Sequence, residues 1–205
     1  SGSDGSAGIV EDASWRRICG VDEVRRGPLA GPVVAAAVVL PRGFDTTGIA
    51  DSKTLDPDTR AAVADRVFRD AVVSVASASA VTIDRLNIRR ATLWAMRRAV
   101  AGLPVPVDCV LFDGVDVPSG IGCLCLSAAR ADGFSHSVGA ASIVAKLVRD
   151  DLMIRLGERL PAYGFERHKG YATPEHREAL ARHGPSVHHR RSFAPVRALL
   201  EGAIP

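Results

Sequence analysis

Apolar residues gather in five short segments bounded by turn-forming residues, and each segment predicts a β-strand. The first two segments are separated by a turn rich in glycine and proline at residues 28–32, which indicates a hairpin. In order along the chain, the predicted strands span residues 17–22, 33–40, 71–80, 107–112 and 122–126.

Helical spacing and capping residues mark the segments between and after these strands. Asp56 followed by Pro57 is typical of a helix start, and Ile143, Leu147 and Ile154 are spaced for one face of a long helix. The predicted helices span 57–70, from Thr82 or Asp84 to Ala101, 139–160, 173–184 and 195–201. Strands mixed with helices, followed by a helical tail, predict an α/β sheet covered by helices and then a helical C-terminal part.

The composition suits one globular domain, because 205 residues that are 47% hydrophobic and 24% charged can bury a substantial core. No apolar run reaches the roughly 18–20 residues of a membrane span, and no signal segment is evident, so we expect a cytoplasmic protein without membrane association. The four cysteines lack the spacing of a disulfide framework and indicate reduced thiols. The net charge of +3 permits a polyanionic partner. Residues 1–14 are expected to form a flexible tail.

Acidic residues follow the predicted strands at the places where an α/β sheet usually has its site crevice. Asp22 and Glu23 end the first strand, Asp113 ends the fourth, and Asp132 precedes the long helix. Gathered carboxylates repel one another unless a cation lies among them, and hard divalent ions prefer oxygen ligands. Two such ions could clamp a phosphodiester. The alternative is that each acid caps a turn or faces water, which we adopt for the acids Asp116 and Asp151.

Six short motifs occur in one order between residues 19 and 196, and with them the chain resembles the ribonuclease HII family. The motifs are DEVRRGPLAGP (22–32), DSK (51–53), DG (113–114), AASIVAK (140–146) followed by Arg149 and Asp150, YGF (163–165) with HKGY (168–171), and HRRSFAPV (189–196). The resemblance implies a ribonuclease H-like fold: a mixed five-stranded sheet flanked by helices, with a helical C-terminal extension. We expect a catalytic domain over residues 15–160 and an extension over 161–205 packed on the same domain.

The resemblance also implies an activity and a site. The expected enzyme is a monomeric, metal-dependent endoribonuclease that uses Mn²⁺ or Mg²⁺. It would hydrolyse the RNA strand of RNA–DNA hybrids and cut 5′ to single ribonucleotides embedded in duplex DNA, which leaves 3′-hydroxyl and 5′-phosphate ends. The catalytic and metal-binding residues would be Asp22, Glu23, Asp113 and Asp132. The substrate-binding residues would be Arg25, Arg26, Gly27, Lys53, Ser142, Lys146, Lys169 and Tyr171.

One departure from the family pattern matters, since Arg25 stands where the family has the first glycine of Gly-Arg-Gly. That loop contacts the sugar bearing the 2′-hydroxyl, the group that distinguishes RNA from DNA. Arg25 either contacts phosphate and strengthens binding or crowds the sugar and weakens activity, and we favour the second because glycine's backbone freedom is hard to replace. Two alternatives therefore remain: a catalytically weakened hybrid-binding protein on the same scaffold, and another metal-dependent nuclease such as a DNA resolvase.

The C-terminal region is the most basic part of the chain, with eight Lys or Arg against three acids between Arg159 and Ala198. Such a region suits the backbone of a nucleic acid duplex, although a solvated helical face would also explain it. Its five histidines lack the spacing of a compact zinc site. We interpret the segment from His189 to Phe193 as structural, docking the tail on the sheet.

Overall fold

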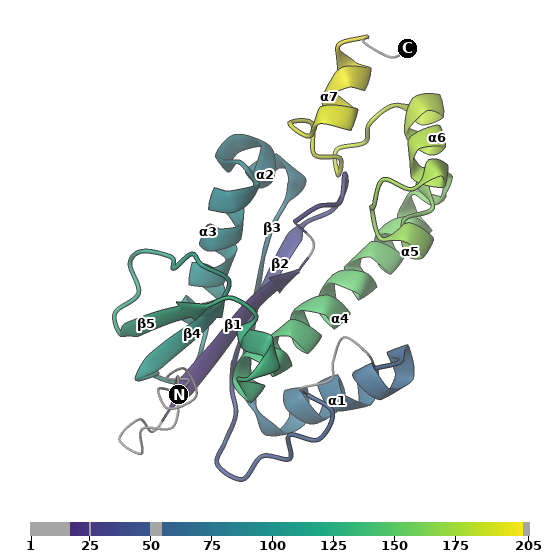
Figure 1. Ribbon diagram of the computed structural model, residues 1–205. Coiled ribbons are helices and arrows are strands. Elements are labelled where there is room, and N and C mark those ends of the chain that lie inside the picture. The colour runs from purple at the N-terminus through teal and green to yellow at the C-terminus, as the bar shows by residue number, and fades with distance from the viewer. Residues whose placement is uncertain (1–16, 25, 50–54, 203–205) are drawn as a thin grey trace, which may run out of the picture.

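The computed structural model describes residues 17–24, 26–49 and 55–202 (Figure 1). The tail predicted for residues 1–14 lies outside the described residues, as do Arg25 and Lys53. Within the described ranges, no helix combines the length and the apolar character needed to cross a membrane.

The core of the fold is a mixed five-stranded sheet, as predicted, and its strands lie in the order β3-β2-β1-β4-β5. The strands are β1 (Ile18–Val24), β2 (Val33–Val39), β3 (Val72–Ala78), β4 (Cys109–Asp113) and β5 (Leu124–Ala128). The three N-terminal strands pair antiparallel, while β4 and β5 add in parallel beside β1. The expected hairpin of β1 and β2 is confirmed.

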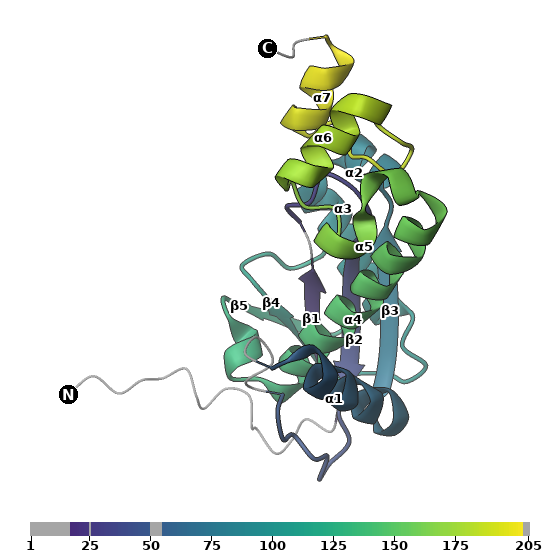
Figure 2. The ribbon, with the colours of Figure 1, turned by 90° about the vertical axis from the view of Figure 1, so that its right-hand side faces the viewer.

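Helices cover both faces of this sheet (Figures 1 and 2). They are α1 (Pro57–Asp70), α2 (Ala80–Leu86), α3 (Ile88–Ala101), α4 (His136–Arg159), α5 (Phe165–His168), α6 (Pro174–His183) and α7 (Ala194–Leu200), with short 3₁₀ turns η1 (Ala131–Gly133) and η2 (Pro161–Tyr163). The centre of the sheet is buried on both sides. Alternate residues of β2 pack toward α3 or toward α1 and α4, because side chains of a strand point to opposite faces in turn.

Several predicted boundaries were wrong, and local caps explain those at Asn87 and Ser135. The predicted helix ending at Ala101 is two helices, since Asn87 adopts a positive φ of 64° and its side chain caps α3. The long helix starts at His136, after the cap Ser135. Strand β1 continues to Val24, and β5 is shifted to Leu124–Ala128.

The predicted apolar face of the long helix is also partly wrong. Ile143 is buried against the sheet and Leu147 packs beside it. Ile154 is 40% exposed, and the buried residue of this turn is Met153, which packs with Tyr163 and Phe165.

The helices that follow α4 gather at one end of the molecule, opposite α1 (Figures 1 and 2). Tyr163 and Phe165 pack with Met153 of α4, and Val196 packs with Leu29 and Leu180. The Asp84 carboxylate of α2 accepts hydrogen bonds from the backbone amides of residues 191 and 192. The segment from His189 to Phe193 therefore docks the tail on the body of the fold, as the sequence indicated.

Candidate active site

Asp22 and Glu23 lie inside β1 and not at its end, which corrects the prediction for this strand. Consecutive strand residues point to opposite faces, so the two carboxylates diverge. Asp22 points toward α4, where it is hydrogen-bonded by the Ser142 hydroxyl. Glu23 lines a cavity on the α3 side together with Thr92 and other α3 residues. Because side chains alternate between the two faces of β1, the adjacent carboxylates of Asp22 and Glu23 do not crowd each other directly.

Asp113 is the last residue of β4 and lies next to β1 in the sheet, as predicted for a strand-end acid. Its Oδ1 accepts a hydrogen bond of 2.7 Å from the backbone N–H of Ala131. That bond ties the end of β4 to turn η1, which carries the buried Asp132. The backbone of Asp132 in turn packs against Gly139 of α4. The four predicted acids thus lie on β1, β4 and the turn hydrogen-bonded to β4.

The acids of the sheet influence one another's protonation. The pKa of Asp22 is raised to about 8, chiefly by burial and also by the charges of Glu23 and Asp113, while the hydrogen bond from the Ser142 hydroxyl opposes the shift. Burial also raises the pKa of Glu23, with Asp113 adding to the effect and Arg26 opposing it. Asp22, Glu23 and Asp113 therefore form one electrostatic cluster, in which added positive charge would favour the ionised state.

The donor set of this cluster fits a hard divalent cation, because carboxylate oxygens are the ligands that Mg²⁺ and Mn²⁺ prefer. In the part of the chain that the structure describes, no three His, Cys, Asp or Glu side chains are already arranged to hold a metal ion. The carboxylates share a region without forming a closed ligand shell, so their assignment as metal ligands stays a prediction.

The cavity beside Glu23 has a volume of about 170 Å³ and is lined by charges of both signs. Glu23 and Asp113 line it with Arg26, Arg89 and Asp116. Arg89 donates from Nε to Asp116 Oδ2 at 2.9 Å. No sequence pattern pointed to Arg89, and Asp116 was expected only to cap a turn or face water. The residues of this ion pair are 27 positions apart, and no local pattern links them.

A second cavity, of about 380 Å³, is mostly apolar and lies away from the acids. It is bounded by the end of α4 and by Gly31, Ser77 and His188, and no acidic residue lines it. The cavity beside Glu23 is therefore the better candidate for acid-dependent chemistry.

The predicted substrate-binding residues fall into two groups. Arg26, Gly27 and Tyr171 form one of them: a Cβ atom on Gly27 would lie 4.0 Å from the Tyr171 ring, and that ring is 39% exposed. Arg26 is exposed and 3.9 Å from Glu23 at its closest charged atoms. These three residues present a continuous accessible surface next to the acid cluster.

The second group makes its contacts within the protein. Lys146 pairs with Asp150 one turn along α4, and the Lys169 ammonium donates to the carbonyl of Glu166. Ser142 lies against Asp22, so its evident role is to hold that carboxylate. Each of these ammonium groups has three N–H donors, so a phosphate could be contacted while these partners are kept.

The chain is similar to proteins of known family. Residues 19–196 match the model of the family described as Ribonuclease HII. A protein named Ribonuclease HII from Parvibaculum lavamentivorans is 49% identical over 196 residues, covering 96% of this chain and 73% of the relative. One of the same name from Xanthobacter autotrophicus is 52% identical over 188 residues, covering 92% of this chain and 75% of the relative.

Solved structures share the fold at lower identity. The ribonuclease H2 from Pyrococcus horikoshii superposes with a TM-score of 0.77 at 22% identity, over 91% of this chain and 98% of that one. A chain from the structure of Bst-RNase HIII in complex with Mn²⁺ superposes with a TM-score of 0.69 at 22% identity, over 91% of this chain and 70% of that one. The expected ribonuclease H-like fold is therefore confirmed.

Proposed function

The chain belongs to the ribonuclease HII family, whose members cleave the RNA of RNA–DNA hybrids, and from that premise we propose a more specific activity for it. We propose that this ribonuclease also incises duplex DNA 5′ to a single embedded ribonucleotide, leaving 3′-hydroxyl and 5′-phosphate ends. The observation that carries the proposal is the electrostatic cluster of Asp22, Glu23 and Asp113 beside the turn of Asp132.

These four acids would hold divalent cations, either Mn²⁺ or Mg²⁺. Bound there, two cations would supply the positive charge that makes water a nucleophile near neutral pH and that stabilises the departing 3′ oxygen. The related Bst-RNase HIII was solved with Mn²⁺, which supports a role for a divalent ion here. Ser142 would keep the Asp22 carboxylate oriented, because its hydroxyl hydrogen-bonds to that group.

The substrate would lie over the surface formed by Arg26, Gly27 and Tyr171. The Tyr171 ring would pack on the nucleotide beside the ribonucleotide, since aromatic side chains stack on nucleotides without demanding a particular base. The backbone at Gly27 would approach the sugar that bears the 2′-hydroxyl. Arg25, Lys53, Lys146 and Lys169 would contact phosphates of the duplex.

The helical region over residues 161–205 would act as an extension of the catalytic domain over residues 15–160. Its apolar residues pack with Leu29 and Met153, and its basic side chains would contact the duplex backbone. We propose that one copy of the chain suffices for activity, because all the proposed site residues come from a single chain, and that the enzyme acts in the cytoplasm.

Cleavage of three labelled duplexes tests the proposal: a continuous RNA–DNA hybrid, a DNA duplex with one ribonucleotide, and an all-DNA duplex. Each is incubated with Mn²⁺, with Mg²⁺ and with a chelator. We expect cleavage of the first two with a divalent ion, 5′ to the ribonucleotide, and no cleavage of the third. Cleavage of the all-DNA duplex would instead favour a DNA nuclease such as a resolvase, and cleavage in chelator would refute the metal dependence.

A second candidate function rests on Arg25, which replaces the family glycine. In this alternative the chain binds hybrids but cleaves them weakly, because Arg25 crowds the sugar. The wild type and Arg25→Gly are assayed side by side on the one-ribonucleotide duplex. A large gain of cleavage in Arg25→Gly over an almost inactive wild type would favour the binding protein, and comparable cleavage by both would favour the enzyme.

A further inference from the structure

Two arginine side chains, Arg149 of α4 and Arg190 in the segment after α6, are completely buried. A guanidinium shielded from water is costly unless its donors are satisfied. Burial, and to a smaller extent the charge of Arg149, lowers the pKa of Arg190 to about 9. The two buried guanidinium groups therefore need hydrogen-bond acceptors. These acceptors lie in the loops that carry the proposed substrate surface.

Arg190 holds the loop that follows β1 at several points. Its Nη1 donates to the carbonyl of Arg26 at 2.8 Å, and its Nε donates to the carbonyl of Gly31 at 3.0 Å. Its backbone N–H donates to the carbonyl of Leu29 at 2.8 Å. The guanidinium carbon lies 5.1 Å from the centre of the Phe193 ring, which keeps the group in place. A single tail residue thereby determines where the backbone of Arg26 lies.

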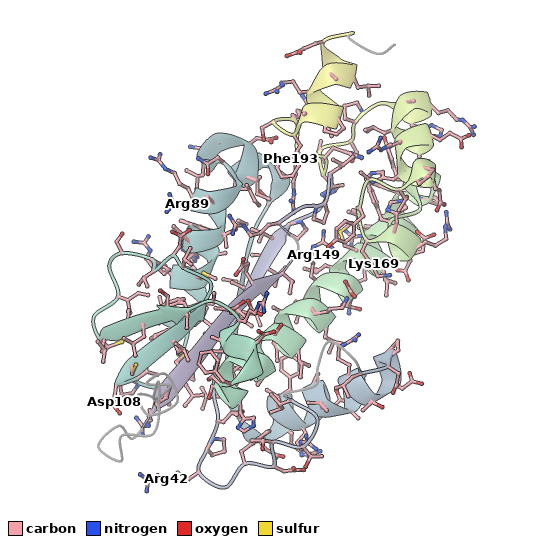
Figure 3. All side chains as sticks on the ribbon, in the orientation of Figure 1. Arg42, Arg89, Asp108, Arg149, Lys169 and Phe193 are labelled. Atoms are coloured by element: carbon pink, nitrogen blue, oxygen red, sulfur yellow. The ribbon has the colours of Figure 1, made fainter. Side chains whose placement is uncertain are left out.

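Arg149 holds the other side of the same loop and links it to a second one. Its Nε donates to the carbonyl of Pro32 at 3.0 Å and its Nη2 to that of Ala30 at 3.1 Å. Its Nη1 donates to the carbonyl of Lys169 at 2.9 Å, and Figure 3 shows Arg149 and Lys169 near each other. Lys169 is two residues before Tyr171, so Arg149 connects both parts of the proposed substrate surface.

The two loops also touch directly. The N–H of Leu29 donates to the carbonyl of Gly170 at 2.8 Å. Gly170 has a φ of 86°, and a Cβ atom there would stand 2.5 Å from the carbonyl oxygen of Ala30, so only glycine fits. Contact this close allows little relative movement while the arginine hydrogen bonds persist.

We infer that Arg149 and Arg190 form a buried clamp that positions the loop of Arg26 and Gly27 against Tyr171 and so determines how strictly the enzyme requires the 2′-hydroxyl of a single ribonucleotide. The inference rests on the proposed function. Neither arginine is accessible to substrate, so both are positioning residues. A duplex with one embedded ribonucleotide has a single 2′-hydroxyl, which can bind in only one position. A continuous hybrid has a 2′-hydroxyl on every nucleotide of its RNA strand, so one reaches the site however the hybrid is positioned. A displaced loop therefore harms recognition of the single ribonucleotide more.

The test replaces each clamp residue by lysine, which keeps the charge but lacks the planar fork that reaches two or three carbonyls. Arg85→Lys is the control for Arg190→Lys, because residue 85 is exposed on α2 and lies outside the proposed substrate surface. Arg155→Lys is the control for Arg149→Lys, because Arg155 is exposed on the same helix. For each variant, kcat and KM are measured on the one-ribonucleotide duplex and on the continuous hybrid.

We expect the ratio of kcat/KM on the one-ribonucleotide duplex to that on the hybrid to fall about tenfold or more in each clamp variant, since a misplacement near 1 Å can cost ~100-fold. The controls should keep the wild-type ratio within about twofold, as surface substitutions usually do. Equal losses on both substrates, or an unchanged ratio, would overturn the clamp and leave only a structural role.

A milder variant keeps the inference testable if a lysine variant does not fold. Phe193→Leu removes the ring beside Arg190 but retains an apolar side chain, and we expect it to shift the ratio in the same direction while leaving the thermal unfolding midpoint close to that of the wild type. An unshifted ratio in folded Phe193→Leu would count against the clamp. Failure of the proposed function looks different, because the wild type itself would then leave the one-ribonucleotide duplex uncut.

Discussion

Gly20 in β1 lies so close to the start of α4 that a Cβ atom built on it would stand 2.2 Å from the carbonyl carbon of Ser137. The same atom would stand 2.2 Å from the backbone nitrogen of Val138. Only a residue without a side chain permits this approach. Asp22 is two positions along on the same face of the strand, so the close approach brings Ser142 of α4 within hydrogen-bonding distance of its carboxylate.

Replacing Gly20 by alanine should therefore destabilise the fold, because the added methyl group meets backbone atoms that cannot move independently. Overpacking of this kind typically costs roughly 1–3 kcal/mol, and contact with backbone places Gly20→Ala at or above that range. Urea unfolding measures the change. Gly122→Ala is the control, since a Cβ there meets no atom within 4 Å, and it should change stability by less than about 0.5 kcal/mol. Equal stability of the two variants would contradict the close packing.

Replacing the clustered acids by their amides should abolish most turnover while preserving the fold. If Asp22 and Asp113 hold cations worth several kcal/mol of transition-state stabilisation, Asp22→Asn and Asp113→Asn should each lower kcat by roughly 100-fold or more. Hybrid binding, measured by fluorescence anisotropy, should survive. The control is Asp151→Asn, because Asp151 is exposed on α4 and paired with Arg155. Cleavage at the wild-type rate by Asp113→Asn would refute its role.

The Tyr171 ring should contribute through its flat face and not through its hydroxyl. Stacking of an aromatic ring on a nucleotide is worth about 1–3 kcal/mol, so Tyr171→Ala should lower kcat/KM on the one-ribonucleotide duplex by roughly 5- to 150-fold. Tyr171→Phe keeps the ring and should stay within about threefold of the wild type. If the two variants lose activity equally, the hydroxyl carries the effect and stacking does not.

Buried histidines form a hydrogen-bonded chain beneath the turn of Tyr171. The backbone N–H of Ser186 donates to Nδ1 of His189 at 2.9 Å, which leaves the proton of the neutral ring on Nε2. Nε2 of His189 lies 3.1 Å from Nε2 of His176, and Nδ1 of His176 lies 2.7 Å from the carbonyl of Tyr171. His168 stacks on His176 with ring centres 4.4 Å apart. Only neutral rings satisfy this chain completely.

Stability should consequently decrease in mild acid. Burial, with smaller contributions from neighbouring histidines, lowers the pKa of His189 to about 4, and burial also lowers the pKa of His176. The unfolded chain takes up these protons near pH 6.5 but the folded one does not, so stability is complete above that pH and is lost as the pH falls toward 4. Urea unfolding at pH 7 and pH 5 should differ by on the order of 1–3 kcal/mol.

The variant His189→Gln separates this effect from the titration of carboxylates. It is expected to be less stable than the wild type at pH 7, because the hydrogen-bonded chain is broken, and to lose less stability between pH 7 and pH 5. A pH dependence identical to that of the wild type would show that the histidines do not cause it.

Local patterns were enough to predict the strands and the capped start of α1, and the motifs were enough to predict the family. The catalytic role of the four acids stays a prediction. Hydrophobic periodicity and helix caps involve residues only a few positions apart, so they can be recognised in the sequence. The same patterns failed at Asn87, where the positive φ that splits one helix into two is a backbone choice no periodicity reveals. They also ended β1 early, because charged residues rarely extend a buried strand without a tertiary reason.

Contacts across the fold settled the remaining features of the site. Pairing of β1 with both neighbours sends Asp22 and Glu23 to opposite faces, and packing joins Arg89 to Asp116. Arg190 reaches the carbonyl of Arg26 from 164 positions away. Such contacts depend on which surfaces meet after the chain collapses, and any one residue gives no local sign of its distant partner. The residue types alone thus indicated which chemistry the side chains can perform. The positions of these side chains relative to one another depended on the packing of the sheet and its helices.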